Sequence, residues 1–93
     1  MDLDSIRIFD RVAELQSFTQ AAEQLNLTKS RVSTVVQQLE QHIGTRLLQR
    51  TTRQVRLTTD GERFLDGCKA LLNDAEQLKS MFQPAASGLH GSL

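Results

Sequence analysis

Apolar positions in the first half of the chain recur every three or four residues and predict three helices. The first begins at a cap on Asp2 or Asp4 and ends near Leu15, and the second covers residues 18–25. The third covers residues 28–43. The inward faces expected for these helices consist of Ile6, Phe9, Val12, Ala13, Ala21, Ala22, Leu25, Val32, Val35, Val36, Leu39 and Ile43.

The second and third helices carry residues that begin and end helices. Ser17 can accept a hydrogen bond from the backbone N–H of Gln20 in a capping box, and Thr28 can cap the third helix. Asn26 and Gly44 can adopt the left-handed conformation that ends a helix. A helix, a short turn and a second helix form the pattern of a helix-turn-helix, whose second helix enters the major groove of DNA.

Two short β-like segments, residues 47–50 and 55–57, follow the third helix and predict a hairpin wing. The turn between them contains neither Gly nor Asn, so its type stays open. The sequence therefore predicts a mainly α fold, a winged helix-turn-helix of three helices and two strands, over residues 1–58.

The last helical pattern, residues 59–83, is the most regular in the chain and is followed by Pro84. Thr58 or Thr59 can cap it, and Thr59 could form a capping box with Glu62. Its apolar residues alternate by three and four over three heptads, which is typical of a helix that pairs with a second copy. The alternative is that this stripe packs on the first three helices. The stripe begins at Gly61, and the residues assigned to a homodimer contact are Phe64, Cys68, Leu71, Ala75, Leu78 and Phe82.

Residues 84–93 contain a proline, a run of small residues and an apolar last residue. They predict a hinge that leads to a further domain absent from this sequence.

The chain has no net charge, but its charges are distributed unevenly. Residues 26–57 contain six basic residues against one acidic residue, a net charge of +5, whereas residues 1–25 carry −3 and residues 58–93 carry −2. The basic segment coincides with the predicted third helix and wing, which indicates a polyanionic partner. A solvated basic face without such a partner is the alternative.

The inward stripe of the third helix leaves polar residues of its first two turns facing outward, where a recognition helix contacts bases. Lys and Arg can donate to guanine, and Ser and Thr can bond base edges or phosphates. Ser17 and Thr28 also stand at helix N-termini, where backbone N–H groups bind phosphate oxygens. The candidate DNA-binding residues are Ser17, Thr28, Lys29, Ser30, Arg31, Ser33, Thr34, Gln37, Arg50 and Arg53.

The predicted wing carries Arg50, Arg53 and Arg56 within seven residues. Arginine at such a tip commonly enters a narrow minor groove, and Arg53 is favoured for this role. Arg50 and Arg56 could instead pair with Asp60 or Glu62, and surface ion pairs of that kind contribute little to stability.

Catalysis and metal binding find no support in the residue pattern. His42 and His90 are isolated, and Cys68 has no neighbouring metal ligands, so no catalytic residue, metal or cofactor is expected. Cys68 is expected to be a small buried hydrophobe rather than a redox sensor. A single cysteine, an acidic N-terminus without an apolar leader and the absence of a membrane-spanning run predict a cytoplasmic protein with no membrane partner.

Two other functions fit parts of the pattern. A protein-interaction module would use the long heptad helix, and its basic segment would be incidental. An RNA-binding protein is disfavoured, because the sequence offers few aromatic side chains on which bases could stack.

Several motifs stand at linked spacings along residues 3–90: Ser17-Phe18-Thr19-x-Ala21-Ala22-x-x-Leu25, Val32-Ser33, Leu39-Glu40, Ile43-Gly44, Leu47-Leu48-x-Arg50-Thr51 and Leu57-Thr58-x-x-Gly61. Together they resemble the N-terminal domain of LysR-type transcriptional regulators. The resemblance implies a linker helix that dimerises antiparallel and a following effector-binding domain, through which alone a small molecule would act. By motif position it also implies DNA contact for Thr28, Lys29, Arg31, Ser33, Thr34 and Arg53.

Two positions depart from the family pattern. The family often has Gln-Pro where this chain has Lys29-Ser30, and a basic residue where Thr34 stands, so base preference cannot be taken from relatives. The resemblance still implies a bacterial regulator that binds a two-fold double-stranded DNA operator as a homodimer. Its helix at 28–43 would occupy the major groove and its wing at 47–57 the minor groove.

Overall fold

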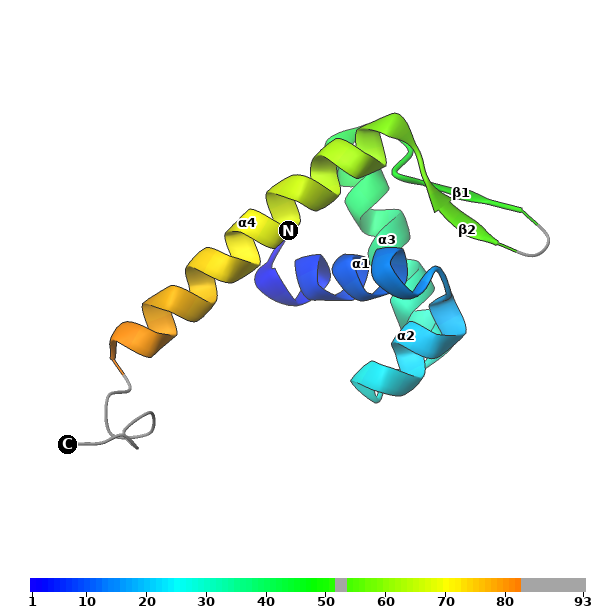
Figure 1. The fold of residues 1–93 in the computed structure, drawn as a ribbon. Coiled ribbons are helices and arrows are strands. Elements are labelled where there is room, and N and C mark those ends of the chain that lie inside the picture. Colours follow the sequence, from blue (N-terminus) through cyan, green and yellow to red (C-terminus); the bar gives the residue numbers. More distant parts are fainter. Residues whose placement is uncertain (52–53, 83–93) are drawn as a thin grey trace.

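Three helices pack around one apolar core, a two-stranded hairpin projects from them, and a long helix leaves in the opposite direction (Figure 1). The computed structural model describes residues 1–51 and 54–82. The fold is the predicted mainly α winged helix-turn-helix with a long additional helix. In chain order the elements are α1 (Leu3–Leu15), α2 (Phe18–Leu25), α3 (Lys29–Ile43), β1 (Leu48–Arg50), β2 (Val55–Leu57) and α4 (Thr59–Met81).

Each helix begins at a polar side chain that accepts a hydrogen bond from a backbone N–H three residues later. Asp2, Ser17, Thr28 and Thr58 are these caps, at distances of 2.8 to 3.0 Å. Capping satisfies N–H groups that the first turn of a helix leaves without a carbonyl partner. The prediction that Thr59 could cap the last helix is wrong, because Thr59 is already its first helical residue.

The predicted helix stops are confirmed by the backbone. Asn26 ends α2 with φ 58° and Gly44 ends α3 with φ 86°, both in the left-handed region. The Leu27 N–H then donates to the Ala22 carbonyl at 2.9 Å, so α2 closes into the turn before α3. This short turn fixes the relative placement of the two helices of the helix-turn-helix.

The hydrophobic core is formed by the inward faces of α1, α2 and α3, the start of β1 and the first half of α4. Ile43 departs from its prediction, since it lies in the last turn of α3 and is 36% exposed. β1 and β2 pair antiparallel with Gln49 opposite Arg56. The buried residues are Ile6, Ile8, Phe9, Val12, Phe18, Ala21, Ala22, Val32, Val35, Val36, Leu39, Leu47, Leu48, Leu65 and Cys68.

The first half of α4 packs on α1. The rings of Phe9 and Phe64 meet edge to face with centroids 5.2 Å apart, and the Lys69 ammonium lies 3.0 Å from carboxylate oxygens of Asp10 and Glu14. The hydrogen bonds that Lys69 donates to Asp10 and Glu14 raise its pKa. In this first half of α4 the heptad stripe packs within the chain, as the alternative interpretation predicted.

Cys68 illustrates this correction. Its side chain is only 2% exposed, so it has almost no surface left for the partner contact to which it was assigned. Phe64 is half-buried against Phe9 for the same reason. The start of α4 lies beside α1, and this neighbour covers the stripe there.

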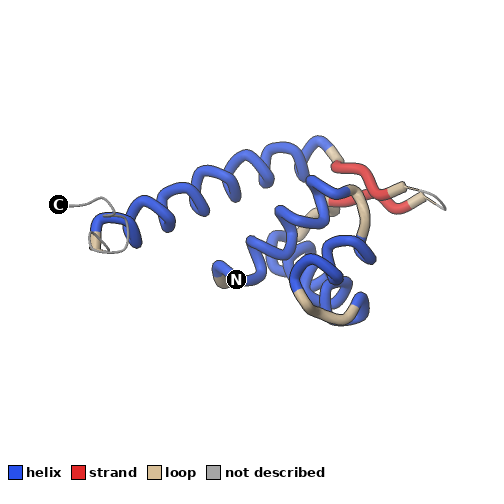
Figure 2. Tube along the Cα trace, turned by 60° about the horizontal axis from the view of Figure 1, so that its bottom comes forward, coloured by secondary structure: helices blue, strands red, loops and turns tan. Residues whose placement is uncertain are grey.

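The second half of α4 runs beyond the three-helix body, as Figures 1 and 2 both show. Its apolar residues therefore stay accessible: Leu71 is 45% exposed, Leu78 59%, and Phe82 76%. Ala75 is half-buried. The second half of α4 and its C-cap Phe82 thus contain the four remaining residues of the predicted dimer contact.

Candidate nucleic-acid interface

The predicted recognition residues lie together on the outward side of α3. Because Val32, Val35 and Val36 point into the core, the polar residues of the first turns face away from it. Lys29, Ser30, Arg31, Thr34 and Gln37 are exposed, as is the cap Thr28, whereas Ser33 is partly buried on the side of α3 that faces the wing.

Arg50, at the end of β1, links the wing to both helices of the helix-turn-helix. Its guanidinium carbon lies 4.3 Å from the centre of the Phe18 ring, and its Nη2 donates to Ser33 Oγ at 3.4 Å. A planar guanidinium on an aromatic face is a favourable cation–π arrangement. The alternative pairing of Arg50 with Asp60 or Glu62 is therefore not what the structure has.

Arg56 also differs from its alternative assignment. Its Nε donates to Gln54 Oε1 at 2.9 Å on the same strand pair. Asp60 instead accepts from the Thr45 hydroxyl at 2.9 Å and lies 4.0 Å from Arg63. Arg53, the tip arginine that was favoured for the minor groove, lies outside the described residues.

Glu40 anchors the wing to α3, a role that the sequence pattern does not reveal. Its Oε2 accepts from the backbone N–H groups of Leu47 and Leu48 at 2.9 and 3.1 Å. On the other side, the Thr58 hydroxyl donates to the Arg46 carbonyl. The one available signal was that Glu40 is the single acid in a segment with six basic residues. It holds the start of the wing beside the end of α3.

We expect Glu40→Ala to lower the free energy of unfolding by about 2 kcal/mol, because two part-buried N–H groups lose a charged acceptor. Glu40→Gln should lower it by about half as much, since the amide oxygen can still accept. Urea unfolding followed by circular dichroism measures both. Gln41→Ala, at the exposed neighbouring position, is the control and should have little effect. Equal stabilities of the Glu40→Ala and Gln41→Ala variants would contradict this anchor.

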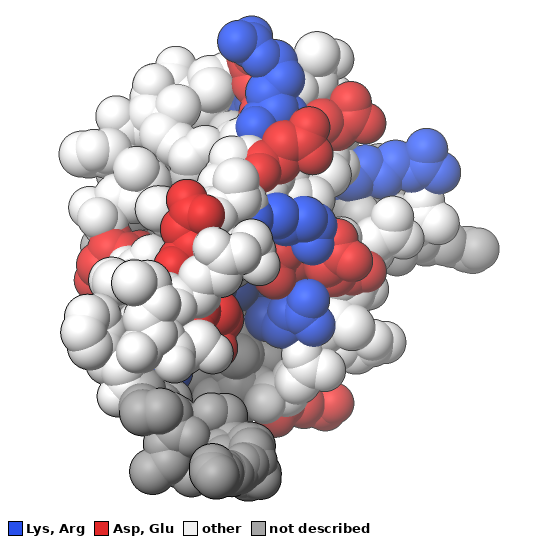
Figure 3. Space-filling view, turned by 60° about the vertical axis from the view of Figure 1, so that its left-hand side comes forward, with Lys and Arg blue, Asp and Glu red and all other residues white. Residues whose placement is uncertain are grey.

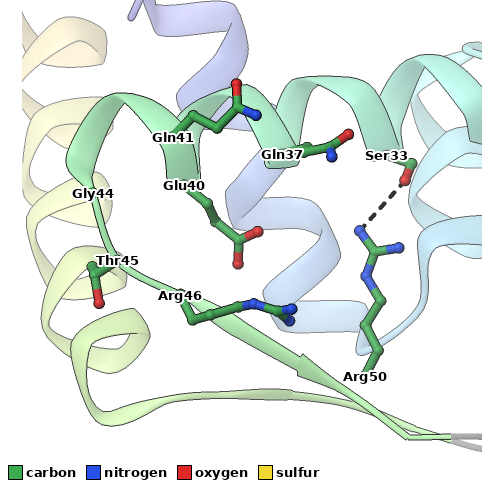
Figure 4. Close-up of a pocket in the computed structure, with 8 residues that line it drawn as sticks. All are labelled: Ser33, Gln37, Glu40, Gln41, Gly44, Thr45, Arg46 and Arg50. Atoms are coloured by element: carbon green, nitrogen blue, oxygen red, sulfur yellow. Dashed lines mark hydrogen bonds between the residues drawn. The ribbon is translucent and has the colours of Figure 1, made fainter.

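Two grooves flank Arg50. One has a volume of about 580 Å³ and runs between α3 and the loop that leads into β1; Figure 4 shows Ser33, Gln37 and Glu40 on its α3 wall. The other, of about 550 Å³, lies between the starts of α2 and α3 and the wing, and its lining includes Ser17 and Lys29. The structure thus brings residues from the helix starts and from the wing to one side of the molecule.

The charges on another side of the molecule are mixed. On the face drawn in Figure 3, basic side chains lie beside acidic ones, and the left of the view is mainly uncharged with some acidic side chains. In contrast, α3, the loop after it and the described residues of the wing carry five of the six basic residues of segment 26–57 together with Glu40. The most basic part of the described surface is therefore the part that carries the recognition candidates.

Cys68 is buried, and this burial together with the nearby Asp10 carboxylate raises the pKa of its thiol to about 11. The residue is thus a protonated, apolar core group, which agrees with the expected buried hydrophobe. Residues 1–51 and 54–82 contain no cluster of three His, Cys, Asp or Glu side chains able to hold a metal ion. No helix within those ranges is long and apolar enough to cross a membrane.

Comparisons with known proteins agree with this geometry. The chain is 41% identical over 91 residues to the uncharacterized HTH-type transcriptional regulator YhjC of Escherichia coli (strain K12), which covers 98% of the chain and 30% of YhjC. It is 44% identical over 95 residues to the HTH-type transcriptional regulator BudR of Raoultella terrigena, covering 100% of the chain and 32% of BudR. The chain therefore spans roughly a third of the length of these relatives.

A crystal structure of the BenM DNA-binding domain in complex with catB site 1 DNA has the same fold, with a TM-score of 0.87 and 39% sequence identity. The match covers 95% of this chain and 98% of that one. A family model described as the bacterial regulatory helix-turn-helix protein, lysR family, matches residues 3–62. The chain belongs to the LysR family of bacterial regulatory helix-turn-helix proteins.

Proposed function

We propose that this chain is the DNA-binding part of a transcription regulator, which recognises a two-fold site in double-stranded DNA as a homodimer. The observation that carries the proposal is the exposed polar set at the start of α3, next to a wing that Arg50 ties to the same helix. In a winged helix-turn-helix, such a helix enters the major groove and the wing lies over the adjacent minor groove. The similarity to BenM, seen in complex with DNA, supports this interpretation.

The proposed roles follow from position and chemistry. Lys29, Arg31 and Thr34 extend outward from the first turns of α3 and would contact base edges, with Ser30 and Gln37 beside them. The residues proposed for phosphate or wing contacts are Ser17, Thr28, Ser33, Arg50 and Arg53. The protein would be cytoplasmic and non-enzymatic, since its site offers recognition groups and its relatives are named transcriptional regulators.

The proposed organisation assigns residues 1–58 to DNA binding, 59–83 to dimerisation and 84–93 to a hinge. Leu71, Leu78 and Phe82 would contact the partner helix in an antiparallel pair, because they form an exposed apolar stripe with no cover from the described part of this chain. Ala75 lies on the same stripe. This pairing would set the half-sites about one or two helical turns apart. A small-molecule effector would act through a further domain of a longer protein.

The experiment that tests this function is a fluorescence-anisotropy titration of the chain with randomised duplexes, followed by selection of bound sequences across a salt series. The proposal requires selection of a two-fold symmetric site and affinity that falls steeply with salt. Retention of dimerisation without binding to any duplex at low salt would instead favour the protein-interaction module.

We expect Arg31→Ala to weaken binding to the selected operator by about 10-fold while changing binding to random duplexes much less, because a base contact is worth about 1–3 kcal/mol of discrimination. Titration of both duplexes measures the ratio. Arg63→Ala is the matched control, since Arg63 is a highly exposed arginine on α4 and is not among the candidate DNA-binding residues. Loss of the same factor on both duplexes would assign Arg31 to the phosphate backbone.

A further inference from the structure

The groove between α3 and the wing holds an arginine that the recognition set does not include. Figure 4 shows the Arg46 side chain extending along the base of this groove, with its guanidinium toward Arg50 and below Gln37. Arg46 is exposed, and within residues 1–51 and 54–82 its side chain forms no hydrogen bond or ion pair. Its backbone is fixed, because the Thr58 hydroxyl donates to its carbonyl.

The two arginines of the groove are held differently. Arg50 is restrained by the Phe18 ring and by Ser33, which together use one face of its guanidinium and one of its N–H groups. A guanidinium has five N–H donors, so several remain for an anion in the groove. No residue in the described part of the chain holds the Arg46 guanidinium, so it can close on the same anion from the other side.

Glu40 also lines this groove, but its carboxylate already accepts hydrogen bonds from the protein backbone. Oε2 accepts from two backbone N–H groups, which offset much of its negative charge. Two guanidinium groups therefore face the groove against one carboxylate, and the amide of Gln37 adds further donors.

We propose that this groove is a phosphodiester-binding site, in which Arg46 and Arg50 together hold one backbone phosphate of the operator. The inference rests on the proposed function, because the strand concerned is the one that passes between the major groove below α3 and the minor groove below the wing. Planar guanidinium groups match phosphate oxygens in geometry and charge. A contact of this kind fixes the register of the protein on DNA without reading sequence.

The test compares Arg46→Gln with Arg56→Gln across a salt series. Arg56 lies on the face of the hairpin opposite to Arg50 and lines a separate pocket. Its substitution therefore removes the same charge from the same wing without altering the proposed site. Each phosphate contact contributes about 0.9 to the magnitude of the slope of log K against log salt concentration. Loss of one contact therefore lowers the affinity at 0.1 M salt by about eightfold. We expect Arg46→Gln to lose this much equally on the operator and on random duplexes, and Arg56→Gln to lose less than half of it.

A second measurement uses the unaltered protein. Neutral methylphosphonate linkages are placed one at a time along the operator, and one position should weaken binding of the unaltered chain but not of Arg46→Gln. Two results would contradict the phosphate site. In the first, the unaltered chain selects an operator, but no methylphosphonate position weakens its binding without also weakening that of Arg46→Gln. In the second, Arg46→Gln and Arg56→Gln have the same slope of log K against log salt. If the unaltered chain binds no duplex at all, the proposed function itself fails.

Discussion

We expect Gly61→Ala to lower the free energy of unfolding by about 3 kcal/mol, because the added methyl group would overlap a backbone carbonyl. Gly61 is buried in the first turn of α4, where a Cβ would overlap the Leu47 carbonyl oxygen and stand 2.9 Å from the carbonyl carbon. That carbonyl cannot move aside easily. It accepts from the Thr58 N–H at 3.0 Å, and the Leu47 N–H is held by Glu40.

Gly67→Ala is the matched control for this substitution. Gly67 lies in the same helix and is exposed, and a Cβ added to it would meet no atom within 4 Å. Alanine there should raise stability by about 0.5–1 kcal/mol, since glycine in a helix interior is the less favourable residue. Urea unfolding of the two variants measures the difference. A Gly61→Ala variant as stable as the unaltered chain would mean that α4 can move away from the Leu47 backbone at no cost.

The second large effect is expected from Leu71→Asp combined with Leu78→Asp. Both side chains are substantially exposed at the end of α4, so each protomer should still fold, but two paired helices would bury four carboxylates. The proposed homodimer should dissociate into monomers. Operator affinity should then fall by about 10²–10³-fold, because the two half-site contacts are no longer linked in one molecule. Sedimentation equilibrium and anisotropy titration measure these two quantities.

Asn73→Asp combined with Gln77→Asp is the control for this experiment. It adds the same two charges to the exposed opposite side of α4 and should leave the dimer and the operator affinity close to unchanged. A Leu71/Leu78 variant that remains dimeric would place the contact between copies elsewhere on the molecule. A monomeric variant with full operator affinity would show that one copy suffices for recognition.

The sequence by itself determined the helices and their ends. Caps such as Ser17 and Thr28 and stops such as Asn26 and Gly44 act on groups within a few residues, so their effect can be predicted from a local pattern. The outward position of Arg31 and Thr34 follows equally from the period of α3, because the inward valines leave only one orientation for the helix.

The tertiary structure alone decided which parts of each pattern meet. The heptad stripe of α4 is uniform in sequence, yet Cys68 is buried against the body and Leu78 is exposed, because α1 reaches only the first half of the helix. Gly61 looked like the first position of that stripe, and it is required by the approach of the Leu47 backbone. Glu40 and Arg50 likewise form hydrogen bonds with groups 7 to 17 residues away, including Ser33. Such contacts depend on how elements cross in space, and no local period encodes that crossing.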